Sequence, residues 1–171
     1  MAATATLAPV GFRLPSEGVR RLVRSLDAYG HAISLPDLIQ ELQQCHLFAD
    51  DMGWHAIYRE DRYARNLIRI SPFYELYCMC WRSGQCSPIH NHGNSLCAVR
   101  VLQGILTNID FASTRPGFAS PWQSTTLAMG DAHGSADGDI HQICNLEPAE
   151  DLMTLHIYSP PLRHMKTFQK A

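Results

Sequence analysis

Three histidines of this 171-residue chain have the spacing of metal ligands. His90 and His92 are separated by one residue, so on a β-strand both imidazoles would point to the same face. His141 lies in a later strand-like run and could complete a site assembled across a barrel. Imidazole nitrogens suit borderline first-row metal ions. The spacing predicts a metal centre, and histidines that only satisfy hydrogen bonds in a core are the alternative.

The three histidines belong to two longer patterns. These patterns read Gly84-x5-His90-x-His92-x4-Cys97-x6-Gly104 and Gly130-x5-Ala136-x-Gly138-x2-His141-x3-Asn145. Together they resemble the two halves of the cupin signature, with Cys97 in place of a glutamate and Ala136 in place of a proline. The resemblance implies a cupin-type antiparallel β-barrel.

Replacing the glutamate changes the charge at the metal. Three neutral imidazoles leave the full +2 charge on a bound ferrous ion, so such a centre should favour anionic ligands. A thiolate is a suitable soft anion, because a metal ion lowers the pKa of a coordinated thiol until it deprotonates. The pattern therefore favours thiol chemistry.

Further segments are similar to the cysteine dioxygenase family over residues 54–168. They are Tyr63-Ala-Arg65-Asn66-Leu67, Leu102-Gln103-Gly104 after Cys97, and Leu155-His156-Ile157-Tyr158-Ser159-Pro160-Pro161. The resemblance implies an Fe(II) enzyme that oxidises L-cysteine to cysteine sulfinic acid with O2. It also implies that cysteine chelates the iron through its thiolate and amine.

Arg65 and Tyr63 are the candidate substrate-binding residues. They lie two residues apart in an alternating run, so they share a face. An arginine that faces into a barrel needs a partner, and the carboxylate of a substrate would supply one. The family resemblance implies the same role for Arg65, whereas an outward, surface-exposed Arg65 is the alternative.

Thr154, His156 and Tyr158 alternate with apolar residues and would share the opposite face of their strand. If that face lines the cavity, the three side chains can form a hydrogen-bonded relay that ends at the phenol; a solvent-exposed face is the alternative. The family has a serine where Thr154 stands. The resemblance also implies a possible thioether bond between Cys97 and Tyr158, with a free buried cysteine as the alternative.

Other functions compete with the leading one. The same chemistry could act on 3-mercaptopropionate or cysteamine, although relatives that act on mercaptopropionate typically have glutamine where Arg65 stands. A non-catalytic metal-binding cupin would not need the Thr154, His156 and Tyr158 face. A metal-dependent isomerase or lyase would usually need a carboxylate near the metal, where this chain has Cys97.

Two periodicities predict the elements that carry these residues. Apolar residues recur at helical spacing over 17–26, after the N-cap candidate Ser16, and over 37–45, after Pro36. From His55 onward, short β-branched and aromatic runs are separated by turn residues. They predict strands at 55–59, 64–70, 74–81, 87–92, 96–102, 104–110, 122–128, 139–145 and 152–158. We therefore expect a mainly β, single-domain protein over 1–171, with a helical layer over 1–53 and a jelly-roll-like antiparallel barrel over 54–168.

The composition of the chain limits which binding partners and which cellular location we expect. The 14 Lys and Arg residues nearly balance the 16 Asp and Glu residues, which argues against nucleic acid as a partner. No apolar run approaches the ~20 residues that cross a bilayer, and residues 1–9 lack the pattern of a secretory signal. We expect a cytoplasmic monomer whose partners are a small thiol and O2. Its six cysteines should be reduced, with Cys78 and Cys80 in the core.

Overall fold

The N-terminal part of the chain is helical. The computed structural model describes residues 16–171, so the prediction about an export signal in residues 1–9 lies outside the described residues. The helices are α1 (Glu17–Asp27), α2 (Leu35–Gln44) and the 3-10 segment η1 (Ala49–His55). The Ser16 hydroxyl accepts a hydrogen bond of 3.2 Å from the Val19 amide, which confirms the predicted N-cap. None of the helices in this described part has the length and apolar character that a membrane span requires.

Ten strands follow, and the chain is mainly β as predicted. The five-stranded sheet has the order β1-β2-β9-β4-β7, and the closed barrel has the order β10-β3-β8-β5-β6. All strand pairs are antiparallel except β10 with β6. The bounds are β1 Ala64–Ile70, β2 Glu75–Trp81, β3 Ile89–His90, β4 Leu96–Gln103, β5 Ile105–Arg115, β6 Phe118–Ala128, β7 Ala132–Ser135, β8 Ile140–Cys144, β9 Leu152–Ser159 and β10 Thr167–Lys170.

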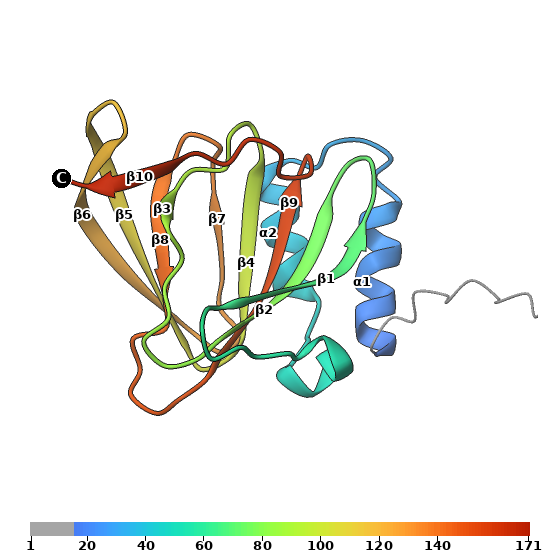
Figure 1. Cartoon of the computed structure of the whole chain (residues 1–171). Coiled ribbons are helices and arrows are strands. Elements are labelled where there is room, and N and C mark those ends of the chain that lie inside the picture. Colours follow the sequence, from blue (N-terminus) through green and yellow to red (C-terminus); the bar gives the residue numbers. More distant parts are fainter. Residues whose placement is uncertain (1–15) are drawn as a thin grey trace, which may run out of the picture.

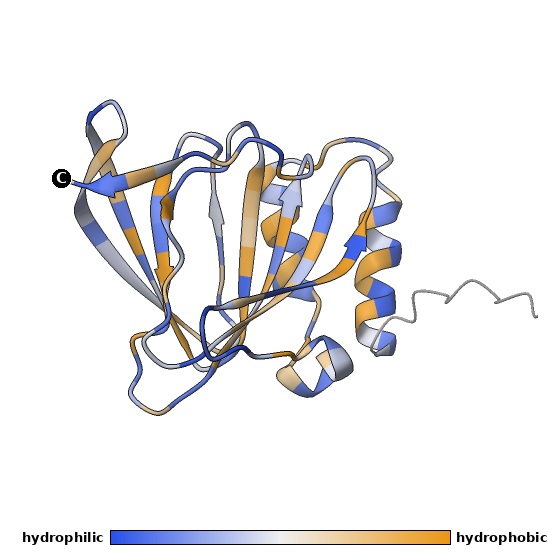
Figure 2. Ribbon diagram, in the orientation of Figure 1, coloured by the Kyte–Doolittle hydropathy of each residue, from blue (hydrophilic) through white to orange (hydrophobic). Residues whose placement is uncertain are grey.

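Helices α1 and α2 lie against one side of the five-stranded sheet (Figure 1). The larger apolar core lies between them, and the apolar stretches of the helices and strands in Figure 2 contribute to it. Cys78 and Cys80 point into this core and are fully buried, as predicted. Met79 and Trp81 alternate with them and belong to a second core, between the two sheets. The second face of the sheet therefore lines the barrel interior, where the candidate site lies.

The strand predicted at 55–59 does not form. The Asp51 carboxylate accepts a hydrogen bond from the Phe48 amide at the start of η1, and this 3-10 segment continues to His55. The carbonyl of Ile57 is satisfied by the Asn66 side chain, so local contacts replace sheet pairing. Conversely, β7 and β10 were not predicted, because both are short and form by pairing with distant strands. The division of the domain at residues 53 and 54 stays a prediction.

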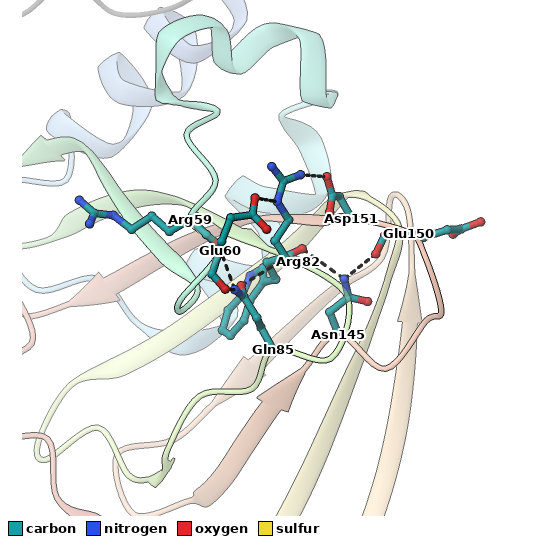
Figure 3. Close-up of polar contacts among 8 residues, drawn as sticks. Arg59, Glu60, Arg82, Gln85, Asn145, Glu150 and Asp151 are labelled. Carbon is teal, nitrogen blue, oxygen red and sulfur yellow. Dashed lines mark hydrogen bonds and ion pairs between the residues drawn. The ribbon is translucent and has the colours of Figure 1, made fainter.

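A polar network links the loops that follow β2 and β8 and precede β1 and β9 (Figure 3). The Arg82 guanidinium forms ion pairs with Glu60 and Asp151 and lies over the Tyr58 ring. Asn145, the last residue of the second histidine pattern, donates hydrogen bonds to the carbonyls of Trp81 and Glu150. The asparagine therefore fixes the connection between β8 and β9.

Cys86 and Cys144 form a disulfide, so the expectation of six reduced thiols is wrong for this pair. The two residues face each other in an isolated antiparallel bridge, and their Cα atoms lie 4.1 Å apart. They are separated by 58 positions in the sequence, so the strand register alone brings them together. Cys45, Cys78, Cys80 and Cys97 are free.

Removing this bridge is expected to lower the free energy of unfolding by about 2–4 kcal/mol, because the unfolded chain loses the constraint of a long closed loop. Urea unfolding of a Cys86→Ser/Cys144→Ser variant would measure the change. Cys45→Ser, which removes a free half-buried thiol, is the control. An unchanged urea midpoint in the double variant would contradict the expectation.

Candidate metal centre

The structure brings the three predicted histidines together. His90 comes from β3, His92 follows it in the loop, and His141 lies opposite His90 in β8. Each is less than 7% exposed, and their candidate ligand nitrogens all lie within 4.8 Å of one another. The His92 and His141 Nε2 atoms are 3.1 Å apart. This is the group of metal-ligating side chains that the described residues offer.

The outer nitrogens of two of these rings are occupied. His90 Nδ1 lies 2.8 Å from the Pro88 carbonyl oxygen, and His141 Nδ1 lies 2.8 Å from Asn108 Oδ1. An oxygen that accepts from Nδ1–H leaves the Nε2 lone pair free. The Nε2 atoms of these two rings are therefore prepared to bind an ion.

The three imidazoles are also electrically suited to a cation. Burial lowers the pKa of His90 and His141, and it lowers the pKa of His92 to about 3, where the charge of His90 adds to the effect. Neutral imidazole is the form that binds metal. The group contains no carboxylate, so a divalent ion would keep its full charge. The arrangement fits a metal cofactor with open positions for ligands.

The ligand loop is held by a close backbone contact. Gly93 follows His92 with φ of +48°, and a Cβ there would lie 1.8 Å from the His164 carbonyl oxygen. Only glycine can occupy this position without moving the segment that contains His164. The contact fixes the chain immediately after the second ligand.

Arg65 points to the same site. It pairs with Met79 of β2, whose side chain belongs to the core between the two sheets. Its guanidinium carbon lies 4.8 Å from the centre of the Tyr77 ring and 5.5 Å from the centre of the Tyr158 ring. The ion pairs of the described residues all involve other cations. Arg65 also shares a side-chain hydrogen bond with Tyr77. A guanidinium carries five N–H donors, and aromatic faces stabilise it without using them, so N–H groups remain to bind an anion.

Tyr63 lies beside this arginine. Its ring stacks on Trp81, with the ring centres 4.2 Å apart and the planes 10° from parallel. The stacking places Tyr63 against the inner face of β2. Arg65 is near enough to His90 and His92 for its charge to help lower their pKa values, and Tyr63 interacts with Arg65.

Thr154, His156 and Tyr158 are all buried and alternate with residues that face the helices. Trp81 Nε1 donates to Thr154 Oγ1 at 3.0 Å, and that hydroxyl lies 2.9 Å from His156 Nε2. The other possible acceptor for the Thr154 hydroxyl, the Met79 carbonyl oxygen, is 3.5 Å away. We therefore conclude that the Thr154 hydroxyl donates its hydrogen bond to His156 Nε2. The solvent-exposed alternative for this face is wrong.

The end of this hydrogen-bonded chain differs from the prediction. His156 Nδ1 lies 3.9 Å from Cys97 Sγ, whereas the His156 and Tyr158 rings are nearly parallel with centres 6.1 Å apart. His156 and Tyr158 lie two residues apart on β9, so their side chains project from the same side of the strand and the two rings lie side by side. The chain of contacts therefore leads from His156 to the Cys97 thiol, which shares a hydrogen bond with Tyr158, so the phenol is reached through Cys97.

Cys97 and Tyr158 are direct partners in the register of β4 and β9. Burial raises the pKa of Cys97 to about 12 and raises that of Tyr158 well above its usual value. A neutral thiol and a neutral phenol therefore meet at the wall of the site. The Tyr158 ring also lies edge-on to His92, with ring centres 5.5 Å apart.

Sequence reasoning missed three residues of the site, Tyr77, Asn108 and Asp110, and assigned no role to Trp81. Trp81 and Tyr77 alternate with the buried cysteines of β2, so strand periodicity could have placed them on the inner face. Asn108 and Asp110 had no local signal. Their role depends on the pairing of β5 with β8.

The closed barrel and its three inward histidines define a cupin. A model of the family "Cysteine dioxygenase type I" matches residues 27–171, and the chain belongs to this family. The chain is 31% identical over 114 residues to cysteine dioxygenase type 1 of Danio rerio, covering 64% of this chain and 57% of that protein. It is 29% identical over 154 residues to the Rattus norvegicus protein of the same name, covering 88% and 76%. The match thus spans about three-fifths of the length of the zebrafish relative.

Solved structures agree on the fold. A Klebsiella pneumoniae protein with a double-stranded β-helix domain superposes with a TM-score of 0.59 at 16% identity, covering 74% of this chain and 94% of that chain. The protein TT1209 from Thermus thermophilus superposes with a TM-score of 0.54 at 19% identity, covering 63% and 92%. These likenesses show the cupin fold alone.

Proposed function

We propose that this protein is an iron(II)-dependent thiol dioxygenase that converts L-cysteine to cysteine sulfinic acid. The observation that carries the proposal is the pairing of a three-histidine group without a carboxylate and an arginine without an acidic partner, both at one site. Family membership supports the same activity. Atoms balance, because one thiol and one O2 give one sulfinic acid with both oxygen atoms on sulfur.

In this proposal, His90, His92 and His141 hold the metal. A bound ferrous ion would supply the redox-active centre where the thiolate and O2 meet. Arg65 binds the substrate carboxylate through guanidinium N–H groups that Tyr77 does not use, with Tyr63 beside it. This anchoring fixes the distance between the carboxylate and the reacting sulfur, so that reaction becomes intramolecular.

The other residues of the site supply a hydrogen-bond donor and hold the side chains around it in place. Tyr158 keeps its proton because burial raises its pKa, so it can donate a hydrogen bond toward developing negative charge. Thr154 and Trp81 orient His156, which lies against Cys97 and the Tyr158 ring. We propose that these residues place the phenol and exclude water.

Oxygen uptake by the iron-loaded full-length chain tests the proposal. Cysteine, 3-mercaptopropionate and cysteamine should be compared, and the product identified by mass spectrometry. Fastest uptake with cysteine and formation of its sulfinic acid are expected, because Arg65 can pair with a carboxylate. Preference for mercaptopropionate or cysteamine would keep the chemistry and change the substrate. No uptake with any small thiol would leave a non-catalytic metal-binding cupin.

We further propose that Cys97 and Tyr158 become joined by a thioether bond. The two side chains are opposite each other in neighbouring strands, and both are buried. Forming the bond removes two hydrogen atoms, and O2 is the oxidant that accepts them.

Protein that has turned over should give a Cys97 peptide joined to a Tyr158 peptide, with the mass of both minus two hydrogens. Peptide mass spectrometry measures this product. The same chain prepared without iron is the control and should give separate peptides. Separate peptides from fully turned-over enzyme would refute the cross-link and leave a free buried cysteine.

The cytoplasm remains the proposed location. Four of the six cysteines are free, and the Cys86–Cys144 bridge is the exception. A small thiol and O2 remain the proposed partners, and a monomer the proposed state.

A further inference from the structure

We infer that Asn108 and Asp110 form a positioning pair that sets the orientation and the protonated nitrogen of His141. Asn108 Oδ1 lies 2.8 Å from His141 Nδ1, and Asn108 Nδ2 donates to Asp110 Oδ1 at 2.8 Å. The three side chains thus form a line that leads away from the metal site. This inference rests on the metal centre of the proposed function and not on the identity of the thiol.

Strand register places the pair behind the ligand. Asp110 is the direct partner of His141 in the pairing of β5 with β8, and Asn108 is the partner of Ile143. Residues two apart on a strand share a face, and so do direct partners across an antiparallel pair. Ile143 belongs to the core between the two sheets, so all of these side chains lie on the interior face. Asn108 is only 3% exposed, which leaves its amide to be satisfied by protein groups.

The donors and acceptors around Asn108 determine which way its side-chain amide points. An ionised carboxylate can only accept, so Asp110 must face the NH2 group of Asn108. The carbonyl oxygen of Asn108 then faces His141 Nδ1 and requires a proton there. A rotated amide would turn its oxygen toward the Asp110 carboxylate, where neither group can donate, so that contact would be lost. Asp110 therefore orients Asn108, and Asn108 in turn selects Nδ1 as the protonated nitrogen of His141.

Among the three ligands, His141 is the one whose Nδ1 is held by a side chain. His90 is held by the Pro88 carbonyl, and His92 interacts with the backbone of Ala136. Acceptors behind metal-binding histidines commonly change metal affinity 10- to 100-fold. Asp110 is half-buried and lines a cleft of about 530 Å³.

Four variants of the full chain test the inference. Asn108→Leu removes the acceptor for His141, and Asp110→Leu removes the acceptor for the Asn108 amide. Asp110→Asn is the conservative rescue, because an amide oxygen can still accept from Asn108 Nδ2. Thr107→Val is the control, since Thr107 is a buried neighbour in β5 whose side chain points away from His141.

Two measurements that need no substrate provide the readouts. Titration with Co²⁺, followed by its visible absorption, gives the affinity of the site. Nitrogen-15 NMR of labelled histidines in metal-free protein shows which nitrogen of His141 carries the proton. We expect the proton on Nδ1 in the parent, Asp110→Asn and Thr107→Val proteins, with Co²⁺ affinities within about 3-fold of each other. Asn108→Leu and Asp110→Leu should lose Nδ1 protonation and bind Co²⁺ about 10- to 100-fold more weakly.

Parent-like affinity and protonation in Asn108→Leu would overturn the inference. If that variant does not fold, the comparison of Asp110→Asn with Asp110→Leu decides. Equal losses of Co²⁺ affinity in Asp110→Asn and Asp110→Leu would show that the charge of Asp110 matters and not the hydrogen bond that it accepts. That result would also overturn the inference. A failure of the proposed thiol oxidation would leave these metal and NMR results unaffected, so the two failures can be distinguished.

Discussion

A His92→Ala variant is expected to lose bound metal and all measurable thiol-dependent oxygen uptake. His92 lies centrally at the site, with its Nε2 atom 3.1 Å from His141 Nε2 and its ring edge-on to Tyr158. Removing one of only three protein ligands should weaken metal binding by more than about 100-fold, beyond the effect typical of an outer acceptor. Metal analysis of the purified variant and an oxygen electrode would measure the two losses.

The matched control for this experiment is His133→Ala. His133 is a half-buried histidine in β7, but it does not belong to the group of three. It should retain metal and most of its activity. Full metal content and normal oxygen uptake in His92→Ala would remove His92 from the ligand set and with it the proposed function.

Arg65→Gln is expected to reduce kcat/KM for cysteine about 100-fold, while oxidation of cysteamine changes by less than about 3-fold. Breaking a hydrogen-bonded charge pair commonly costs 2–5 kcal/mol, and a 100-fold loss corresponds to about 2.7 kcal/mol. Cysteamine lacks a carboxylate and cannot use Arg65 in this way. The expected effect is therefore specific to substrates that carry the carboxylate.

Steady-state oxygen uptake with the two thiols gives the comparison. Arg69→Gln is the control, because Arg69 lies on the same strand but pairs with Asp27 of α1, away from the site. Its kcat/KM values should match those of the parent. Equal losses for cysteine and cysteamine in Arg65→Gln would assign Arg65 a structural role and contradict carboxylate binding.

The arrangement explains how a site with few charged groups could favour an anionic thiol. The histidines are neutral, because burial lowers their pKa values, and Cys97 and Tyr158 are neutral, because burial raises theirs. The carboxylates nearby are set back from the site, since Glu75 accepts from the Tyr77 hydroxyl and Asp110 accepts from Asn108 behind His141. The positive charge at the site is that of Arg65, to which a bound metal ion would add. Arg65 and the ion would both attract a substrate that carries a thiolate and a carboxylate.

Much of the candidate site could be predicted from local spacing. His90 and His92 share a face because they lie two residues apart, and the same rule places Thr154 with His156 and Tyr158. The order of contacts among these last residues could not be predicted this way. Whether His156 contacts Cys97 or the Tyr158 hydroxyl depends on the register of β4 and β9, which no local pattern specifies.

Local sequence patterns were enough to predict most of the secondary structure and the group of three histidines. Apolar periodicity predicted α1, α2 and, with approximate bounds, eight of the ten strands. The two histidine patterns indicated a cupin barrel with a metal centre. These features depend on residues within a few positions of each other, where side-chain direction follows directly from backbone geometry.

Contacts between segments that are distant in the sequence could be read from the folded chain but not from local patterns. It joined Cys86 to Cys144, added β7 and β10 to the sheets, and placed Asn108 and Asp110 behind His141. Each of these depends on which strands pair and in which register. Register is set by the combined burial of many side chains over the whole barrel, so a short stretch of sequence does not contain it.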